Sequence, residues 1–265
     1  MAKLDANFNF TGPLGKISAY RMRGIDRIIL RKKGGASKRK IKTSRNFART
    51  REANAEFGGR SIAGKWIRSA LHYQKPMADY NISGPINALL VPIQEQDTVS
   101  PPGQRNIVLS KNPWLLQGFS LNRGTGFDSI VRNPLAWTLS RDTLSARIDI
   151  PALLPGINFF TAEKHPMYSI IATLGIVPDF FYNKWGYQPS SREYRQNDMQ
   201  AADTGWYPVL KGSPAMKLEI QMDTVPPDQS FSLVLSIGIR FGAMRDAGTI
   251  EQVKYAGAAK ILAMG

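Results

Sequence analysis

The sequence contains no cysteine, which excludes disulfide bonds, thiolate catalysis and cysteine-based zinc sites. Only two histidines are present. His72 lies near the end of a predicted helix, where the helix dipole favours a cation, and this role is favoured over metal ligation. His165 precedes a proline in a loop and has no triad signature around it. We therefore expect no metal, no cofactor and no enzymatic activity.

Long apolar runs are also missing. No stretch approaches the roughly 18 uninterrupted apolar residues of a membrane-spanning helix. The first ten residues lack the apolar core of a signal peptide. The sequence therefore predicts a protein without a membrane-spanning helix or a signal peptide. A cytoplasmic or virion-like location is expected.

Acidic residues are scarce at one end of the chain. Residues 1–75 contain 19 Lys and Arg against 4 Asp and Glu, a net of +15, whereas residues 76–265 contain 16 of each. The densest stretch, Arg31–Arg51, has ten cations and no carboxylate. Lys and Arg neutralise phosphates and release counterions with little need for fixed geometry. We predict that this stretch contacts nucleic acid or another polyanion, the alternatives being a solvated face or an acidic protein surface. The predicted contact residues are Arg31, Lys32, Lys33, Lys38, Arg39, Lys40, Lys42, Arg45, Arg49 and Arg51.

Sequence-specific recognition is not indicated, so binding should be mainly to backbone phosphates. A zinc finger is impossible without cysteine, and no aromatic strand motif of RNA-binding domains is visible. Residues 12–18 superficially match a phosphate loop, but the glycine spacing is wrong and a strand is predicted to follow.

The basic quarter is predicted to fold locally. Residues 12–31 suggest a β-hairpin with a turn at 23–26, and arginines 21, 23, 27 and 31 could line one polar face. Residues 33–37 indicate a flexible connection. Two helices are expected at 44–57, capped by Ser44, and at about 60–74, because paired glycines at 58–59 cost about 2 kcal/mol in a helix interior. Ile62, Ala63, Trp66, Ile67, Ala70 and Leu71 form an apolar face on the second helix.

After Pro76 the sequence changes to short apolar runs separated by Pro, Gly and Asn. The strongest is 231–241, which alternates with period two. A polar, aromatic segment at 182–206 suggests a long connection. The other strand candidates are 86–93, 106–109, 114–121, 135–139, 145–150, 168–177, 216–223 and 258–264.

These patterns predict a mainly β fold. We expect an antiparallel β-sandwich or barrel at 76–265, preceded by a basic module of hairpin and helices at 1–75. The charge-neutral second part is compatible with self-association.

Two other features have open interpretations. The aromatics of residues 180–207, among them Trp185, could stack on bases or sugars, or could pack against the protein or a neighbouring subunit. Asp149, Glu219 and Asp223 lie on predicted strand faces, where exposed charge is the default and a carbohydrate-cleaving pair the minor alternative.

Several stretches resemble an uncharacterised protein family of Bacteroidetes-type bacteria. They are residues 15–20, 31–35, 47–52 with Asn54, 56–58, and 253–260. The resemblance covers the two ends better than the middle and implies a bacterial or phage origin, without assigning a function to any residue. A looser analogy of architecture links the basic arm and β-sandwich to viral coat proteins.

The leading hypothesis is a non-enzymatic structural or assembly protein, a homo-oligomer with no membrane contact, whose basic module binds nucleic acid or an acidic protein surface. A self-assembling or protein-binding module without nucleic acid is the second hypothesis. A polymer hydrolase is the third.

Overall fold

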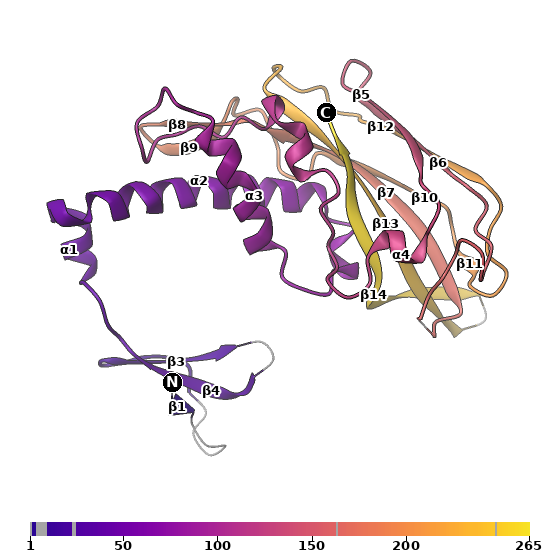
Figure 1. The fold of residues 1–265 in the computed structure, drawn as a ribbon, viewed down its shortest axis with the longest axis horizontal. Coiled ribbons are helices and arrows are strands. Elements are labelled where there is room, and N and C mark those ends of the chain that lie inside the picture. The colour runs from indigo at the N-terminus through magenta and orange to yellow at the C-terminus, as the bar shows by residue number, and fades with distance from the viewer. Residues whose placement is uncertain (1, 4–9, 23–24, 163, 247) are drawn as a thin grey trace. The chain divides into compact units, whose positions relative to one another are not determined.

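The computed structural model describes residues 2–3, 10–22, 25–162, 164–246 and 248–265 (Figure 1). By its internal contacts the chain divides into two compact units, Met1–Arg51 and Glu52–Gly265. The domain boundary expected after residue 75 is based on the distribution of charge along the sequence. The division after Arg51 is based on contacts within the folded chain. Strands outweigh helices, 39% against 24%, so the protein is mainly β with several antiparallel sheets. None of the sheets within the described ranges closes into a barrel.

The first unit contains a small antiparallel sheet in the order β1-β4-β3-β2. Its strands are β1 (Ala2–Lys3), β2 (Gly12–Leu14), β3 (Ile17–Met22) and β4 (Ile25–Lys32). Strands β3 and β4 pair from Ile17↔Lys32 to Met22↔Ile25. Residues 23–24 of the expected turn, including Arg23, lie outside the described residues. The buried apolar side chains described in this sheet are Ala19, Ile28 and Ile29, so its core is small.

Helix α2 (Ala48–Ala70) corrects the prediction of two helices interrupted by paired glycines. A Cβ on Gly59 would lie 2.7 Å from the ring of Tyr187, while Gly58 has nothing within 4 Å. Gly59 therefore permits a close helix–ring contact, and tertiary packing outweighs the low helix propensity of glycine. The expected apolar face is confirmed for Ala63, Trp66, Ile67, Ala70 and Leu71, which are all buried, but not for Ile62, which is 38% exposed.

The core of the second unit is a sheet in the order β10-β7-β13-β14, with β11 also paired to β7. Its strands are β7 (Met167–Pro178), β10 (Met199–Asp203), β11 (Tyr207–Pro208), β13 (Phe231–Asp246) and β14 (Thr249–Met264). The strands predicted at 168–177, 231–241 and 258–264 are confirmed, and the last two are longer than predicted. Pairs such as Leu235↔Leu174 fix the register. Leu233, Leu235, Ile237 and Ile239 are fully buried, as are the alternate residues Ser232 and Ser236, so both faces of β13 are covered.

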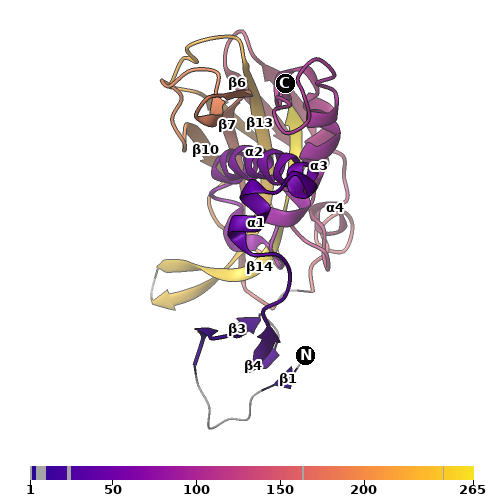
Figure 2. The same ribbon diagram turned by 90° about the vertical axis from the view of Figure 1, so that its left-hand side faces the viewer.

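Helices cover one face of this sheet, as Figure 2 shows for α2 and α3. The sheet offers glycines where the helical layer approaches closely. A Cβ on Gly175 would lie 2.6 Å from that of Ala70, and one on Gly238 would lie 2.6 Å from the Met77 methyl group. Met77 lies in the 3-10 helix η2 (Lys75–Met77). The backbone at Gly175 and Gly238 thus leaves room for a tight helix–sheet contact.

A second antiparallel sheet has the order β12-β6-β5. It consists of β5 (Ala136–Ser140), β6 (Ser145–Ile150) and β12 (Met216–Gln221), which confirms three of the expected strands. Ala146, Ile148 and Ile150 are buried and alternate with less buried Arg147 and Asp149. This alternation is typical of a strand with one face on a core.

Four sequence predictions in the second unit are wrong. Residues 86–93 belong to helix α3 (Ser83–Glu95), whose Ile86, Leu90 and Ile93 are buried at helical spacing. A short apolar run fits a helix as well as a strand. Residues 106–109 and 114–121 form 3-10 helices and irregular structure instead of strands: η3 (Leu109–Lys111) and η4 (Pro113–Leu116). A short helix α4 (Phe127–Ile130) follows. The expected connection at 182–206 contains part of the hairpin β8 (Phe180–Asn183) and β9 (Gly186–Pro189), and also β10.

Candidate nucleic-acid interface

Nine of the ten predicted contact residues lie on β4, two short helices and the start of α2, and Lys33 lies in the connection after β4. Arg31 and Lys32 end β4, Lys33 follows it, and four cations lie in helix α1 (Lys38–Thr43). Arg45 lies in the 3-10 helix η1 (Arg45–Phe47), and Arg49 and Arg51 begin α2. Nine of the ten side chains are exposed, and Arg51 is partly buried. The structure therefore places most of this charge at the surface of the unit.

Helix α1 presents the densest part of this charge. Ser37 caps it, since its Oγ accepts from the Lys40 backbone N at 3.2 Å, and none of its six residues is buried. A helix this short has little stability of its own. Lys38 and Lys42 also lie one turn apart on the same face, where like charges repel by a few tenths of a kcal/mol. An anion between them would relieve that repulsion.

Arg51 and Lys33 make contacts within the unit. Arg51 Nη1 donates to the carbonyl oxygens of Ile41 and Ser44, both at 2.8 Å, and so satisfies backbone groups at the end of α1. Lys33 Nζ donates to the Gly15 carbonyl at 3.2 Å. Arg51 thus has a structural role that sequence reasoning missed, because a charge pattern does not reveal which cation folds back onto the backbone.

The hairpin arginines are only partly placed. Arg21, Arg27 and Arg31 are exposed. The β3–β4 register is irregular between Tyr20 and Met22, at the position of Arg21. Their alignment on one face stays a prediction.

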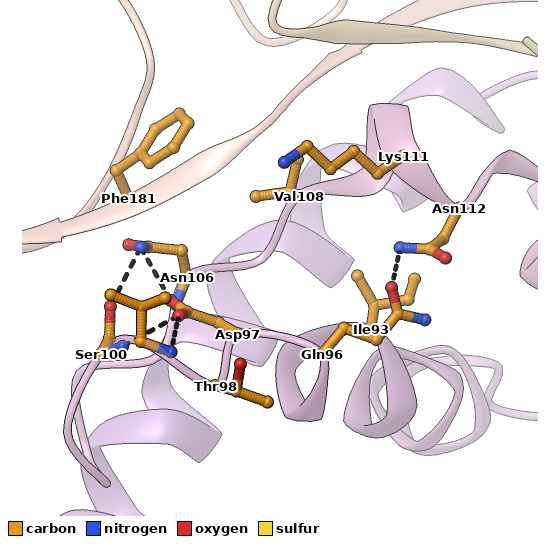
Figure 3. Close-up of a pocket in the computed structure, with 11 residues that line it drawn as sticks. Ile93, Gln96, Asp97, Thr98, Ser100, Asn106, Val108, Lys111, Asn112 and Phe181 are labelled. Carbon is orange, nitrogen blue, oxygen red and sulfur yellow. Dashed lines mark hydrogen bonds between the residues drawn. The ribbon is translucent and has the colours of Figure 1, made fainter.

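The second unit has a pocket of about 360 Å³ between the end of α3, the loop after it and β8 (Figure 3). Its only carboxylate among the described lining residues is Asp97, which accepts from the backbone N of Val99, Ser100 and Asn106 at 2.8–3.1 Å. Desolvation acts to raise the pKa of Asp97, but these hydrogen bonds outweigh it and lower the pKa to about 2. Asp97 is therefore ionised at neutral pH, anchors the loop and is poorly suited to proton transfer.

The carboxylates considered for hydrolysis have partners. Arg147 contacts Asp149 at 3.2 Å and Glu219 at 3.8 Å across β6 and β12. Asp223 accepts from Gln200 Nε2 at 2.5 Å. In the part of the chain that the structure describes, no three His, Asp or Glu side chains are grouped to hold a metal ion. These contacts agree with the interpretation of Asp149 and Glu219 as strand-face charges, whereas Asp223 lies beyond the end of β12 at Gln221.

Three aromatics of the 180–207 segment, Phe180, Tyr187 and Tyr194, are buried inside the unit. Burial raises the pKa of Tyr187 to about 12, and its hydroxyl donates to the Arg105 carbonyl at 2.9 Å. Tyr194 donates to Asp228 at 2.7 Å, and desolvation raises its pKa. Trp185 differs from these, because 70% of it is exposed.

No family model matches the chain, and neither a curated protein nor a solved structure has significant similarity to it. Among the helices of the described residues, none is long and apolar enough to cross a membrane.

Proposed function

We propose that the protein is a non-enzymatic assembly protein whose basic first unit contacts the phosphates of nucleic acid or a comparable polyanion. The observation that carries the proposal is the charge segregation, with ten cations and no carboxylate in residues 31–51. The exposure of nine of these side chains supports it. Contact through phosphates needs charge density more than sequence readout.

In this proposal residues 76–265, which carry no net charge, form a β-sandwich with the subunit contacts, and a basic hairpin precedes it. Strand β12 contacts β7 and β10. Leu218 and Ile220 share one apolar core with Leu235 and Ile237. Such a role is compatible with a bacterial or phage origin.

Binding of labelled DNA and RNA to the full chain at two salt concentrations tests this function. The substitutions Lys38→Gln, Arg39→Gln, Lys40→Gln and Lys42→Gln, combined in one variant, should reduce the salt slope by about 0.9 for each phosphate that is no longer neutralised. A matched control removes four exposed lysines of the second unit, Lys111, Lys164, Lys211 and Lys217. Binding that is absent, insensitive to salt, or equally weakened in both variants contradicts the proposal.

A second candidate, self-assembly without nucleic acid, is favoured by the β13–β14 hairpin. Strand β13 pairs with β7 only as far as Gly242. Beyond that point, Ala243, Met244 and Asp246 of β13 pair with Glu251, Ile250 and Thr249 of β14. Figure 2 shows this end projecting from the sheet. Met244 and Tyr255 are 63% and 65% exposed there. A free two-stranded ribbon is marginally stable and offers open edges to another chain.

Size-exclusion chromatography with light scattering tests this candidate. Nucleic-acid-free oligomers that Met244→Asp dissociates support it. A monomer at all concentrations contradicts it.

A further inference from the structure

Trp185 occupies the turn of a tight hairpin in the second unit. Asn183 pairs with Gly186, so Lys184 and Trp185 form a two-residue connection between β8 and β9. Asn183 Oδ1 accepts from the Trp185 backbone N at 2.8 Å, which fixes the turn. Tryptophan is usually well buried, yet 70% of Trp185 is exposed. The fold therefore holds a large aromatic face toward solvent.

A groove of about 680 Å³ lies beside this tryptophan. Helix α2 lines it with Ile62 and Trp66, and the chain from Asn183 to Gln196 lines the rest. Trp66 is buried and packs edge-on against Phe180 at 6.0 Å between ring centroids. One wall of the groove is thus set by the apolar core, while Trp185 is accessible at its margin.

The polar groups around the groove are cationic or neutral. Lys184 Nζ lies 5.2 Å from the Trp185 ring centroid, and Arg192 is an exposed lining residue. Among the described residues that line the groove, none is acidic. A flat aromatic face with cations nearby suits a ligand that combines a planar ring with negative charge.

We propose that this groove binds single-stranded nucleic acid, with one base stacked on Trp185 and the adjacent phosphate near Lys184 and Arg192. A duplex does not fit this chemistry, because its bases are stacked on each other and cannot lie on the indole. A neutral sugar could also stack on the indole, but it would leave the two cations, Lys184 and Arg192, without an anionic partner. The site acts by stacking, and goes beyond the charge-based contact proposed for the first unit.

The test is binding of a labelled oligothymidylate to the full chain at high salt, which screens phosphate contacts but preserves stacking. Trp185→Ala should weaken binding by about tenfold or more, since each stacked base contributes substantially to affinity. Trp185→Phe should retain most of the affinity. The matched control is Trp114→Ala, which removes another exposed tryptophan (61%). In a salt titration, Arg192→Gln should lower the salt slope by about 0.7, the value for one phosphate contact on a single strand.

Three results overturn the inference. They are equal affinity of Trp185→Ala and the unmodified chain, equally strong competition by duplex DNA, and Trp185-dependent binding of a neutral oligosaccharide. A change of oligomeric state in Trp185→Ala without loss of oligonucleotide affinity assigns the surface to a protein partner and also overturns it. The two proposals fail separately: the quadruple glutamine variant of α1 tests the charge contact, and Trp185→Ala at high salt tests the stacking site.

Discussion

In the second unit a buried carboxylate has a matched cation, whereas residues 31–51 of the first unit hold ten cations and no carboxylate. Glu56, whose side chain is 8% exposed, accepts from Arg105 Nε and Nη2, both at 2.7 Å, and from the Gly103 backbone N. Charge in the second unit supports folding. Charge in the first is largely exposed.

The two units also differ in their cores. The first buries few apolar side chains, while the second has an extensive core spanning both sheets and the helices. A small core gives little stability. A polyanion that binds only the folded form of the first unit would stabilise it by mass action.

The largest predicted effect is the loss of stability when the buried ion pair between Glu56 and Arg105 is removed. Glu56→Ala leaves Arg105 without its carboxylate, so the free energy of unfolding should fall by about 3 kcal/mol. Urea denaturation measures it. The control is Glu219→Ala, whose side chain is 70% exposed and whose loss should cost well under about 1 kcal/mol. Similar losses in both variants contradict the structural role of Glu56.

The next effect tests the helix–ring contact. Gly59→Ala places a methyl group against the Tyr187 ring and should destabilise the protein by about 1–3 kcal/mol. Its neighbour is the control, because Gly58→Ala meets nothing within 4 Å and should stabilise by up to about 1 kcal/mol. Thermal unfolding of both variants measures the difference. The contact is disproved by a Gly59→Ala protein as stable as Gly58→Ala.

Acid should weaken the second unit. The hydrogen bond from Arg105 lowers the pKa of Glu56, although burial opposes it. Desolvation acts to raise the pKa of Asp97, but hydrogen bonds from backbone N–H groups lower it to about 2. Both groups stabilise the fold above their unfolded pKa values, and this contribution is lost as pH falls through the folded values. Between about pH 5 and pH 2, Asp97→Asn should remove on the order of 1–2 kcal/mol of the pH dependence. An unchanged stability profile in that variant argues against the anchor role of Asp97.

A smaller, local effect concerns Arg51. Arg51→Leu removes two hydrogen bonds to the end of α1, and the opening free energy of that helix should fall by about 1 kcal/mol. Amide hydrogen exchange of α1 measures it. Arg45→Leu removes an exposed cation and should leave the exchange rates of α1 unchanged. If exchange is equally faster in both variants, the hydrogen bonds of Arg51 do not stabilise the end of α1.

The smallest predicted effect is the change in the free energy of unfolding when the cations of α1 are replaced. The quadruple glutamine variant of Lys38, Arg39, Lys40 and Lys42 should change the free energy of unfolding by within about 0.5 kcal/mol, since all four side chains are exposed. Calorimetry checks this. A loss above about 2 kcal/mol would show that these cations stabilise the fold, and the contrast between the units would disappear.

Periodicity predicted three strands of the second unit. Segments 145–150, 216–221 and 231–241 alternate clearly, and one or both faces lie on the core. The strand predicted at 86–93 was wrong because a short apolar run has no period that distinguishes a strand from a helix. The helix break predicted at the glycines 58–59 was wrong because Gly59 packs against Tyr187, which lies more than a hundred residues away in the sequence.

Charge alone identified the candidate interface, while its details needed coordinates. Nine of the ten cations are exposed as a polyanion contact requires. The cap formed by Arg51 depends on where the helix ends, which no charge pattern encodes. The exposure of Trp185 depends on a hairpin inside a segment expected to be a connection.

Helix α2 has a consequence for the order of synthesis. Its residues are translated early, but Gly59 and Glu56 meet Tyr187 and Arg105, and Ala70 meets Gly175. The strand β14 that completes the central sheet is translated last among these elements. Until then Trp66, Ile67 and Leu71 have no sheet to cover them, and on the ribosome they form an apolar stripe beside a strongly basic segment. Nascent chains in that state are prone to aggregation. We expect production of this protein to depend on holdase chaperones more strongly than its final stability suggests.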